Sequence, residues 1–445
     1  MLKNRRITFI VVGVSLLLTL CAAVFWIYRD TLIAKGEEPT TSVAENAVID
    51  RLHTWVETTS AKIISRCYNH QYENGVCRVC GHVCTHSFTS GVCNLCGTEC
   101  DHLWEDGICF ICGMACEHRW HDIYTQRCTE CGELVRHHMV NAQCSVCGYQ
   151  PQFLDDFLPD EYYTACDEQG TVLTHHFSVP LYGTDKVISR VAKIYLPYGY
   201  DENDTSVKYN VLIATHGAGD DGDALIDKVQ RYGGAGRKMI YRDMYDWMHK
   251  YKECDPFIVV GVSYEGYIGD NFASVSGAQF GRELREYLLP YMAENFHTYA
   301  ENGSEEALQK ARQHFGMCGF SNGSLMTLQA GIIQDFDIMG NFICMSGNHC
   351  YVTIADVLNS EKYQNYPIHC YYASAGTNDN QLSNTSKGCN WLIENVSRAH
   401  FGSNTFLEKV DGGHDYKVWH TSMYNALKVM FQDVSESVPN NAVIN

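Results

Sequence analysis

Fourteen of the 22 cysteines in this chain lie between Cys67 and Cys147, where a short Cys/His motif is repeated. A full unit reads Cys-x-His, then six to nine residues, then Cys-x-x-Cys-Gly, and successive units are sixteen residues apart except for one step of nineteen. Such a unit holds too few apolar side chains to fold unaided, so metal ions or disulfides must organise the segment. This requirement limits residues 67–150 to a string of small, cross-linked units.

The spacing favours zinc. Three thiolates and one imidazole complete a tetrahedral shell around Zn²⁺, and the Cys-x-x-Cys turn points both sulfurs at one ion. The expected ligand sets are Cys67, His70, Cys77 and Cys80; Cys84, His86, Cys93 and Cys96; Cys100, His102, Cys109 and Cys112; and Cys116, His118, Cys128 and Cys131. In a degenerate fifth unit, His137 or His138 joins Cys144 and Cys147, with Arg136 where a cysteine is expected; we assign His138.

Seven disulfides are the alternative, and an extracellular location would favour them. Disulfides do not explain the histidine two residues after each of three cysteines, whereas bound zinc would supply on the order of 10 kcal/mol of folding free energy. Four-ligand shells leave no position for a reacting water molecule. We therefore expect structural zinc in the repeats and no cofactor for catalysis.

An uncharged apolar run, residues 7–28, follows the basic residues Lys3, Arg5 and Arg6. At 1.5 Å per residue the run reaches about 33 Å, enough to cross a hydrocarbon core of about 30 Å. A cleaved signal peptide or a lipoprotein site at Cys21 is the alternative. We expect residues 1–28 to be a single-pass anchor in the cell membrane, with everything after it extracellular because the basic end stays in the cytoplasm.

The remaining chain divides by composition. Residues 29–66 resemble a stalk or linker, and from about Asp160 to residue 435 β-branched runs, glycine turns and helical stretches alternate, which is typical of an α/β domain. The formal net charge of −19 argues against a nucleic-acid partner, because phosphate binding needs an excess of lysine and arginine.

A nucleophile motif lies inside this α/β region. Gly319-Phe320-Ser321-Asn322-Gly323 has the pattern G-x-S-x-G, between a predicted strand at residues 314–318 and a predicted helix at residues 322–334. A turn this sharp exposes the serine hydroxyl and needs small neighbours on both sides. The pattern predicts Ser321 as a nucleophile, with the Asn322 N–H facing a developing oxyanion.

Three loops supply the other groups that such a serine needs. Residues 211–219 read as a buried strand ending in a His-Gly loop, a type that provides a second oxyanion N–H, here from Ala218. A predicted strand at residues 368–375 precedes Asp379, and His414 lies in a glycine-rich loop before a terminal helix. The order serine, aspartate, histidine along the chain is the order used by α/β-hydrolases, so we expect that doubly wound, mostly parallel sheet.

Five segments carry a resemblance to a known family: KIYLPYGY at Lys193, THGAGDD at Thr215, ELREYLLPYMAENF at Glu283, GTND at Gly376 and GGHDYKVW at Gly412. From about residue 172 to residue 431 the chain resembles the esterase D and carbohydrate esterase family, in particular the feruloyl-esterase domains attached to bacterial xylanases. The resemblance implies a Ser321–His414–Asp379 triad and hydrolysis of feruloyl- or acetyl-type esters on plant polysaccharides.

Other side chains are given structural roles. Ser346 is interpreted as a turn residue, His216 as a residue that positions its loop, and His420 as a surface residue of the final helix. Asp335 and Asp337 are expected to face solvent.

Two other function classes stay open: a cell-surface binding or adhesion protein that uses the repeats and an inactive hydrolase scaffold, and a hydrolase of another acyl bond, such as a thioester or a peptide.

Overall fold

The computed structural model describes residues 71–73, 76–78, 83–97, 99–105, 108–117, 127–232, 237–266, 275–347 and 349–435. The chain divides into two compact units, one comprising Met1–Leu103 with Cys109–Met114 and the other Trp104–Ile108 with Ala115–Asn445. Within the described ranges no helix is both long and apolar enough to span a membrane. The anchor at residues 1–28 and the stalk at residues 29–66 lie outside these ranges and stay predictions.

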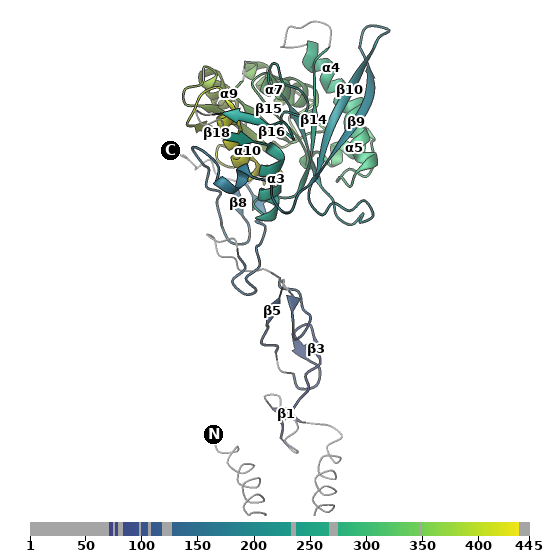
Figure 1. Cartoon of the computed structure of the whole chain (residues 1–445), viewed down its shortest axis with the longest axis vertical. Coiled ribbons are helices and arrows are strands. Elements are labelled where there is room, and N and C mark those ends of the chain that lie inside the picture. Colours follow the sequence, from purple (N-terminus) through teal and green to yellow (C-terminus); the bar gives the residue numbers. More distant parts are fainter. Residues whose placement is uncertain are drawn as a thin grey trace, which may run out of the picture. The chain divides into compact units, whose positions relative to one another are not determined.

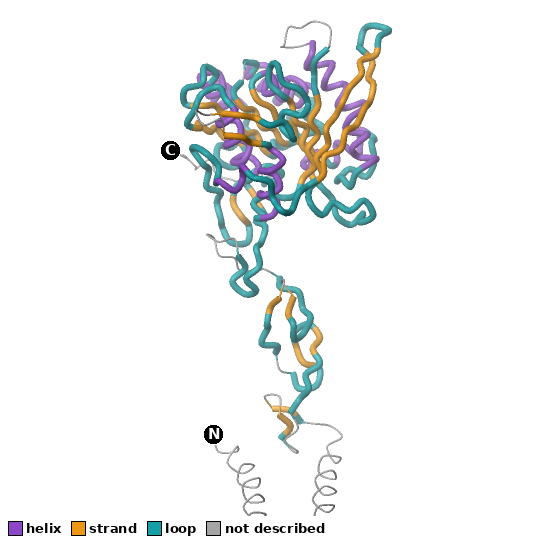
Figure 2. The backbone as a smooth tube through the Cα atoms, viewed as in Figure 1, coloured by secondary structure: helices purple, strands orange, loops and turns teal. Residues whose placement is uncertain are grey.

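An eight-stranded sheet forms the centre of the second unit (Figures 1 and 2). Its strands are β9 (Thr171–Pro180), β10 (Val187–Leu196), β11 (Asn210–Thr215), β14 (Phe257–Val262), β15 (Phe315–Phe320), β16 (Asn341–Met345), β17 (Cys370–Gly376) and β18 (Thr405–Val410). Their spatial order is β18-β17-β16-β15-β11-β14-β10-β9. The six strands from β18 to β14 pair in parallel, whereas β10 is antiparallel to both β14 and β9. The predicted mostly parallel sheet is confirmed.

Helices cover both faces of this sheet. Their bounds are α3 (Tyr241–Lys250), α4 (Val275–Glu283), α5 (Leu289–Asn295), α6 (Glu305–Lys310), α7 (Asn322–Met326), α8 (Tyr351–Leu358), α9 (Leu382–Asn395) and α10 (Tyr416–Leu427). Helices α3 and α10 contribute their buried side chains to one core, and α4 to α9 contribute theirs to the other. The chain is therefore doubly wound, as predicted.

The central strands belong to both cores because successive side chains of a strand point to opposite faces. In β11 every residue is buried; Val211 and Ile213 pack into one core, and Leu212 and Ala214 into the other. Strands buried on both faces are typical of parallel sheets covered by helices. This explains the unbroken apolar run from Val211 to Ala214 in β11.

Shorter elements complete the unit. They are the 3₁₀ turns η1 (Asp160–Tyr163) and η3 (Arg312–His314), the π-helical segments η2 (Leu284–Leu288) and η4 (Thr327–Gln334), and the hairpin of β12 (Gln230–Tyr232) and β13 (Arg237–Met239). The helix predicted at residues 322–334 is thus α7 followed by a π-helical segment. The strand predicted at residues 314–318 spans Phe315–Phe320 in the structure. It begins one residue later than predicted because His314 belongs to η3.

The α/β domain begins earlier than Asp160. Phe153 packs edge-on against Tyr372 and Phe406, with ring centroids 5.9 and 6.2 Å away. The backbone of Leu154 exchanges two hydrogen bonds with the side chain of Asn425. These contacts make the segment before residue 160 part of the core of the α/β domain.

The Cys/His repeats consist of small hairpins. The strand pairs are β1 (Tyr72–Glu73) with β2 (Val76–Cys77), β3 (Phe88–Thr89) with β4 (Val92–Cys93), β5 (Trp104–Glu105) with β6 (Ile108–Cys109), and β7 (Met139–Val140) with β8 (Gln143–Cys144). After each described Cys-x-x-Cys pair a glycine donates its N–H to the carbonyl of the first cysteine, for example Gly97 to Cys93 at 2.8 Å. Gly97 has a φ of 70°, a conformation that glycine adopts without strain, which explains the glycine in the motif.

Candidate active site

Ser321 lies at the sharp turn between β15 and α7. Its φ is 54°, a region in which a residue other than glycine is strained, and its N–H bonds to the Met345 carbonyl at 2.8 Å. A Cβ at Gly319 would lie 2.4 Å from the Gly323 backbone, and one at Gly323 would lie 2.2 Å from the Thr215 carbonyl oxygen. Both glycines of the G-x-S-x-G pattern are therefore required by close backbone packing around the serine.

The structure brings the three predicted side chains together. His414 Nε2 lies 3.0 Å from Ser321 Oγ, and His414 Nδ1 lies 3.0 Å from each carboxylate oxygen of Asp379. Ser321 follows β15, Asp379 follows β17, and His414 lies between β18 and α10. All three thus sit at the carboxyl ends of parallel strands, the edge at which catalytic groups gather in open α/β sheets.

The Asp379 carboxylate is buried but well supplied with donors. Its Oδ1 accepts the Gln381 N–H at 2.7 Å, and the side chains of His414 and Ser346 also donate to the carboxylate. Burial acts to raise the pKa of Asp379, but these hydrogen bonds outweigh it and the pKa lies below its ordinary value. The group is therefore an anion at neutral pH, as needed to orient and stabilise a protonated imidazole.

Trp419 supports this arrangement and was missed by the sequence reasoning. Its indole Nε1–H donates to Ser346 Oγ at 2.9 Å, while its ring stacks on Phe320 with centroids 4.2 Å apart. The ring also meets the His414 imidazole edge-on at 5.1 Å. Ser346 is indeed in a turn, with a φ of 58°, but it also links Trp419 to Asp379. Only the position of Trp419 in the GGHDYKVW segment offered a sequence signal for it.

The two predicted oxyanion donors lie on different segments, one directly after the serine and the other in the loop after β11. Asn322 begins α7, and Ala218 is an exposed residue of the loop after β11. His216 holds that loop as predicted, because its buried ring bonds to Ser263 Oγ at 3.0 Å and stacks on Tyr264. Tyr264 in turn donates its hydroxyl to the His216 carbonyl at 2.9 Å.

Three side chains do not lie where the sequence reasoning put them. Asp335 and Asp337 were expected to face solvent but are buried. Both form ion pairs with Arg285, Asp335 at 3.0 Å and Asp337 at 2.5 Å. His420, expected at the surface, is fully buried with its ring 3.9 Å from that of Tyr241. In each case a residue distant in sequence covers the side chain: Arg285 covers the two aspartates, and Tyr241 covers His420.

The Cys/His repeats form the predicted ligand groups where they are described. Two complete sets have all four donor atoms within 4.8 Å of one another: Cys84, His86, Cys93 and Cys96, and Cys100, His102, Cys109 and Cys112. Cys116, Cys128 and Cys131 form a third group, whose expected ligand His118 lies outside the described residues. Of the first unit only Cys77 is described, so Cys67, His70 and Cys80 stay untested.

The distances within these groups fit a tetrahedral zinc ion. Zinc–sulfur bonds of about 2.3 Å and zinc–nitrogen bonds of about 2.0 Å place two sulfurs about 3.8 Å apart and a sulfur and a nitrogen about 3.5 Å apart. The structure has 3.6 Å between the sulfurs of Cys84 and Cys93 and 3.3 Å between Cys96 Sγ and His86 Nδ1. A disulfide needs about 2.05 Å. No disulfide joins any of the cysteines in the described ranges.

In the fifth unit the ligand group contains His137, not His138. His137 lies with Cys144 and Cys147, its Nδ1 3.5 Å from Cys147 Sγ. His138 points elsewhere and contacts Ser145 Oγ at 2.9 Å and Asp433 at 3.4 Å. The assignment of His138 is corrected accordingly, because the strand after the histidine fixes which of the two neighbours faces the thiols.

Comparisons with known proteins agree with this fold. No family model matches the chain. Endo-1,4-beta-xylanase Y of Acetivibrio thermocellus is 26% identical over 193 residues, which are 43% of this chain and only 16% of that protein. A serine-to-alanine mutant of the feruloyl esterase module from Clostridium thermocellum, complexed with sinapinate, aligns with a TM-score of 0.53 and 20% identity over 64% of this chain and 96% of that module.

A ferulic acid esterase from Anaeromyces mucronatus aligns over 63% of this chain and 98% of its own, with 20% identity and a TM-score of 0.47. At such identities a likeness establishes the fold alone, and the fold assignment rests on the bacterial module. The second unit therefore has the α/β-hydrolase fold, and its structural neighbours include feruloyl esterases.

Proposed function

We propose that this chain is a serine esterase that hydrolyses feruloyl- or acetyl-type esters on polysaccharide-derived substrates. Ser321 is the nucleophile, His414 the general base and Asp379 the group that orients the imidazole. The observation that carries the proposal is the continuous contact from Asp379 through His414 to Ser321, with 3.0 Å at each step. Such a relay, with its serine at a strained turn, is the arrangement that nucleophilic acyl transfer requires.

The reaction follows from this contact. The Ser321 hydroxyl attacks the ester carbonyl while His414 Nε2 takes its proton, and the Asp379 carboxylate stabilises the imidazolium. The alcohol leaves with the proton from His414, and the acyl group remains on Ser321. Water then attacks the acyl-enzyme, again losing its proton to His414, and the carboxylic acid leaves as Ser321 is restored.

The N–H groups of Asn322 and Ala218 are proposed to bind the oxyanion of each tetrahedral intermediate. In the described part of the chain neither amide donates a hydrogen bond to another group, so both can serve a ligand. One such donor contributes about 3 kcal/mol to the transition state. The positive end of α7 adds to this stabilisation only weakly, because the α-helical part is short.

The substrate class rests on the relatives. The bacterial module that shares the fold is a feruloyl esterase complexed with sinapinate, and the sequence relative is a xylanase. Both point toward aromatic acyl groups on plant cell-wall polysaccharide. The predicted membrane anchor and extracellular location would place such an enzyme where polymeric substrates occur.

A fluorophosphonate probe tests the nucleophile. We expect the probe to label Ser321 and labelling to vanish in Ser321→Ala. Ser346→Ala is the comparison variant, because Ser346 also lies at a strained turn but should not carry the label; Ser321 should still be labelled in it, at a lower rate because Asp379 loses a donor. Labelling that persists in Ser321→Ala would contradict the assignment.

A panel of substrates tests the reaction class. Turnover of methyl ferulate, feruloyl-arabinoxylan or acetyl-xylan that depends on Ser321 supports the proposal. Preference for thioesters or peptides would reassign the acyl bond, and labelling without turnover of any substrate would favour the binding or adhesion role. Extraction of the full chain from membranes at alkaline pH, compared with a chain lacking residues 1–28, tests the anchor.

A further inference from the structure

The fifth Cys/His unit has three ligands where the complete units have four. His137, Cys144 and Cys147 lie within 4.8 Å of one another, and no other histidine, cysteine or carboxylate of the described chain joins them. The separation of Cys147 Sγ and His137 Nδ1, 3.5 Å, matches the 3.3 and 3.4 Å of the two complete sets. The three groups that remain are therefore already arranged around one point, as for a metal ion.

The register of the unit shows what replaces the missing thiolate. In the complete units the histidine ligand comes two residues before the first hairpin strand, His86 before Phe88, and His137 precedes Met139 in the same way. The cysteine two residues before the histidine therefore corresponds to Val135, not to Arg136. Valine offers no donor atom, so the fourth tetrahedral position has no protein ligand in this part of the chain.

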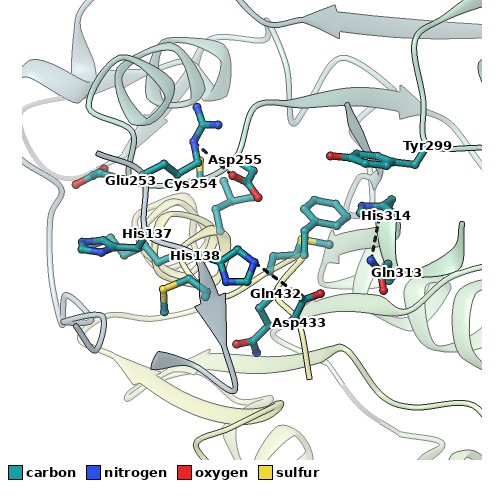
Figure 3. A pocket seen from close by; sticks show the side chains of 16 residues that line it. His137, His138, Glu253, Cys254, Asp255, Tyr299, Gln313, His314, Gln432 and Asp433 are labelled. Atoms are coloured by element: carbon teal, nitrogen blue, oxygen red, sulfur yellow. Dashed lines mark hydrogen bonds and ion pairs between the residues drawn. The ribbon is translucent and has the colours of Figure 1, made fainter. Parts of the chain in front are cut away.

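The hydrolase core holds this unit in place. The N–H of Asn141 bonds to the Asp433 carbonyl at 3.0 Å, and the Asp433 N–H bonds to the Met139 carbonyl at 3.0 Å. Lys252 donates to the Leu134 carbonyl at 2.7 Å, and Arg136 forms an ion pair with Asp255 at 3.4 Å. Figure 3 shows the contact of His138 with Asp433 beside the cavity that these residues line. These contacts fix the fifth unit without a fourth metal ligand.

The complete units are small hairpins with little apolar core of their own. Each consists of a two-residue hairpin and a turn, and several of their apolar side chains are exposed, including Leu95, Leu103 and Phe110. Such units depend on the metal for folding and need a closed shell. The fifth unit, held by the hydrolase, can keep an incomplete shell without unfolding.

We infer that the fifth unit binds zinc through His137, Cys144 and Cys147 and keeps the fourth position open to an external donor. Three protein ligands with a free position are the arrangement of reactive zinc sites, whereas four are that of structural sites. Two thiolates neutralise the charge of Zn²⁺, so the site accepts a water molecule, a thiolate or a small anion without the excess negative charge of a three-thiolate shell.

The site is separate from the ester-hydrolysing centre. His137 lines a cavity of about 340 Å³ together with Gln313 and His314, which immediately precede β15, whereas Ser321 follows the other end of that strand. Of the three ligands, Cys147 is partly exposed, which gives small donors access to the metal position. The inference does not depend on the esterase proposal, and its failure would leave that proposal intact.

Zinc content of the purified full chain tests whether the fifth unit binds metal. We expect the double variant Cys144→Ser/Cys147→Ser to hold one zinc ion fewer per chain than the wild type. An unchanged zinc content in this variant would overturn the inference. A thermal unfolding transition like that of the wild type verifies that each variant is folded.

Chelator competition tests whether the fourth position is open. We expect 4-(2-pyridylazo)resorcinol to remove one zinc ion per chain in a separate fast phase, because an open position admits the chelator. Val135→Cys supplies the missing thiolate and should abolish that phase, while the matched control Val135→Ser should retain it. Persistence of the fast phase in Val135→Cys, or its absence from the wild type, would overturn the open position.

Replacing zinc by cobalt provides an independent test of whether the fourth coordination position is open. Added azide or 2-mercaptoethanol should shift the visible cobalt bands of the wild type but not those of Val135→Cys. An identical response of both proteins would mean that the external donor does not bind at the fourth position of this site.

Discussion

Replacing Trp419 by phenylalanine should weaken catalysis through Ser346 and Asp379. The substitution keeps an aromatic ring against Phe320 and removes only the Nε1–H that donates to Ser346 Oγ at 2.9 Å. Both side chains are buried, with 6% of Trp419 and 1% of Ser346 exposed, so water cannot replace the lost donor. A buried group left without its partner costs about 1–3 kcal/mol of folding free energy.

The cost to catalysis is smaller than the cost to stability. The lost hydrogen bond exists in the ground state as well, so only the part that depends on the orientation of Asp379 affects the transition state. We expect kcat to fall about tenfold, equivalent to about 1.4 kcal/mol, with little change in KM, and the Tm to fall by about 2 to 10 °C. Methyl ferulate turnover and thermal unfolding provide the two measurements.

A double-mutant cycle identifies the route. Ser346→Ala removes the donor to Asp379 directly, so adding Trp419→Phe to it should lower kcat no further. Trp391→Phe is the control, since Trp391 is 37% exposed and lies on α9. If the effects of Trp419→Phe and Ser346→Ala multiply in the double variant, Trp419 acts through its ring contacts instead and the reasoning fails.

Three further outcomes are expected. Asp379→Asn should lower kcat by about 10⁴-fold in stopped-flow or steady-state ester assays, because the imidazole loses its orienting anion; a loss below tenfold would argue against the triad. Burial raises the pKa of Glu408 to about 8, so the stability that its protonated form provides is present below about pH 4.5 and lost as the pH rises through 8. Glu408→Gln should therefore show a smaller fall in Tm between pH 5 and 9 than the wild type, and an equal fall would refute this origin. A chain starting at Asp160 should unfold at a lower temperature than one starting at residue 127, because it lacks Phe153 and its neighbours; equal Tm values would show that the earlier segment only rests on the core.

Features set by residues close together in sequence were predictable. The two glycines around Ser321 are needed because the turn brings their backbones against Thr215 and each other, and such a turn leaves a readable pattern. The Cys-x-x-Cys-Gly turns are equally local, since one hydrogen bond across the turn and one left-handed glycine define them. The order of Ser321, Asp379 and His414 then indicated the sheet on which they meet.

Contacts between distant segments were not predictable from the same information. The choice of His137 over His138 depends on the register of a hairpin, which a shift of one residue would reverse. The burial of Asp335 and Asp337 depends on Arg285, some fifty residues earlier, and the role of Ser346 depends on Trp419, seventy-three residues later.

The sequence by itself determined which residues can do chemistry here: a serine at a strained turn, a histidine and an acid in strand-end loops, and thiolates in pairs. Only the tertiary structure decided which other side chains hold these groups in position. Helix packing on the two faces of the sheet brings Trp419 against His414 and Ser346. It also decided that the last Cys/His unit packs against the hydrolase core, which is the physical reason that this unit needs no fourth Cys or His to be held in place.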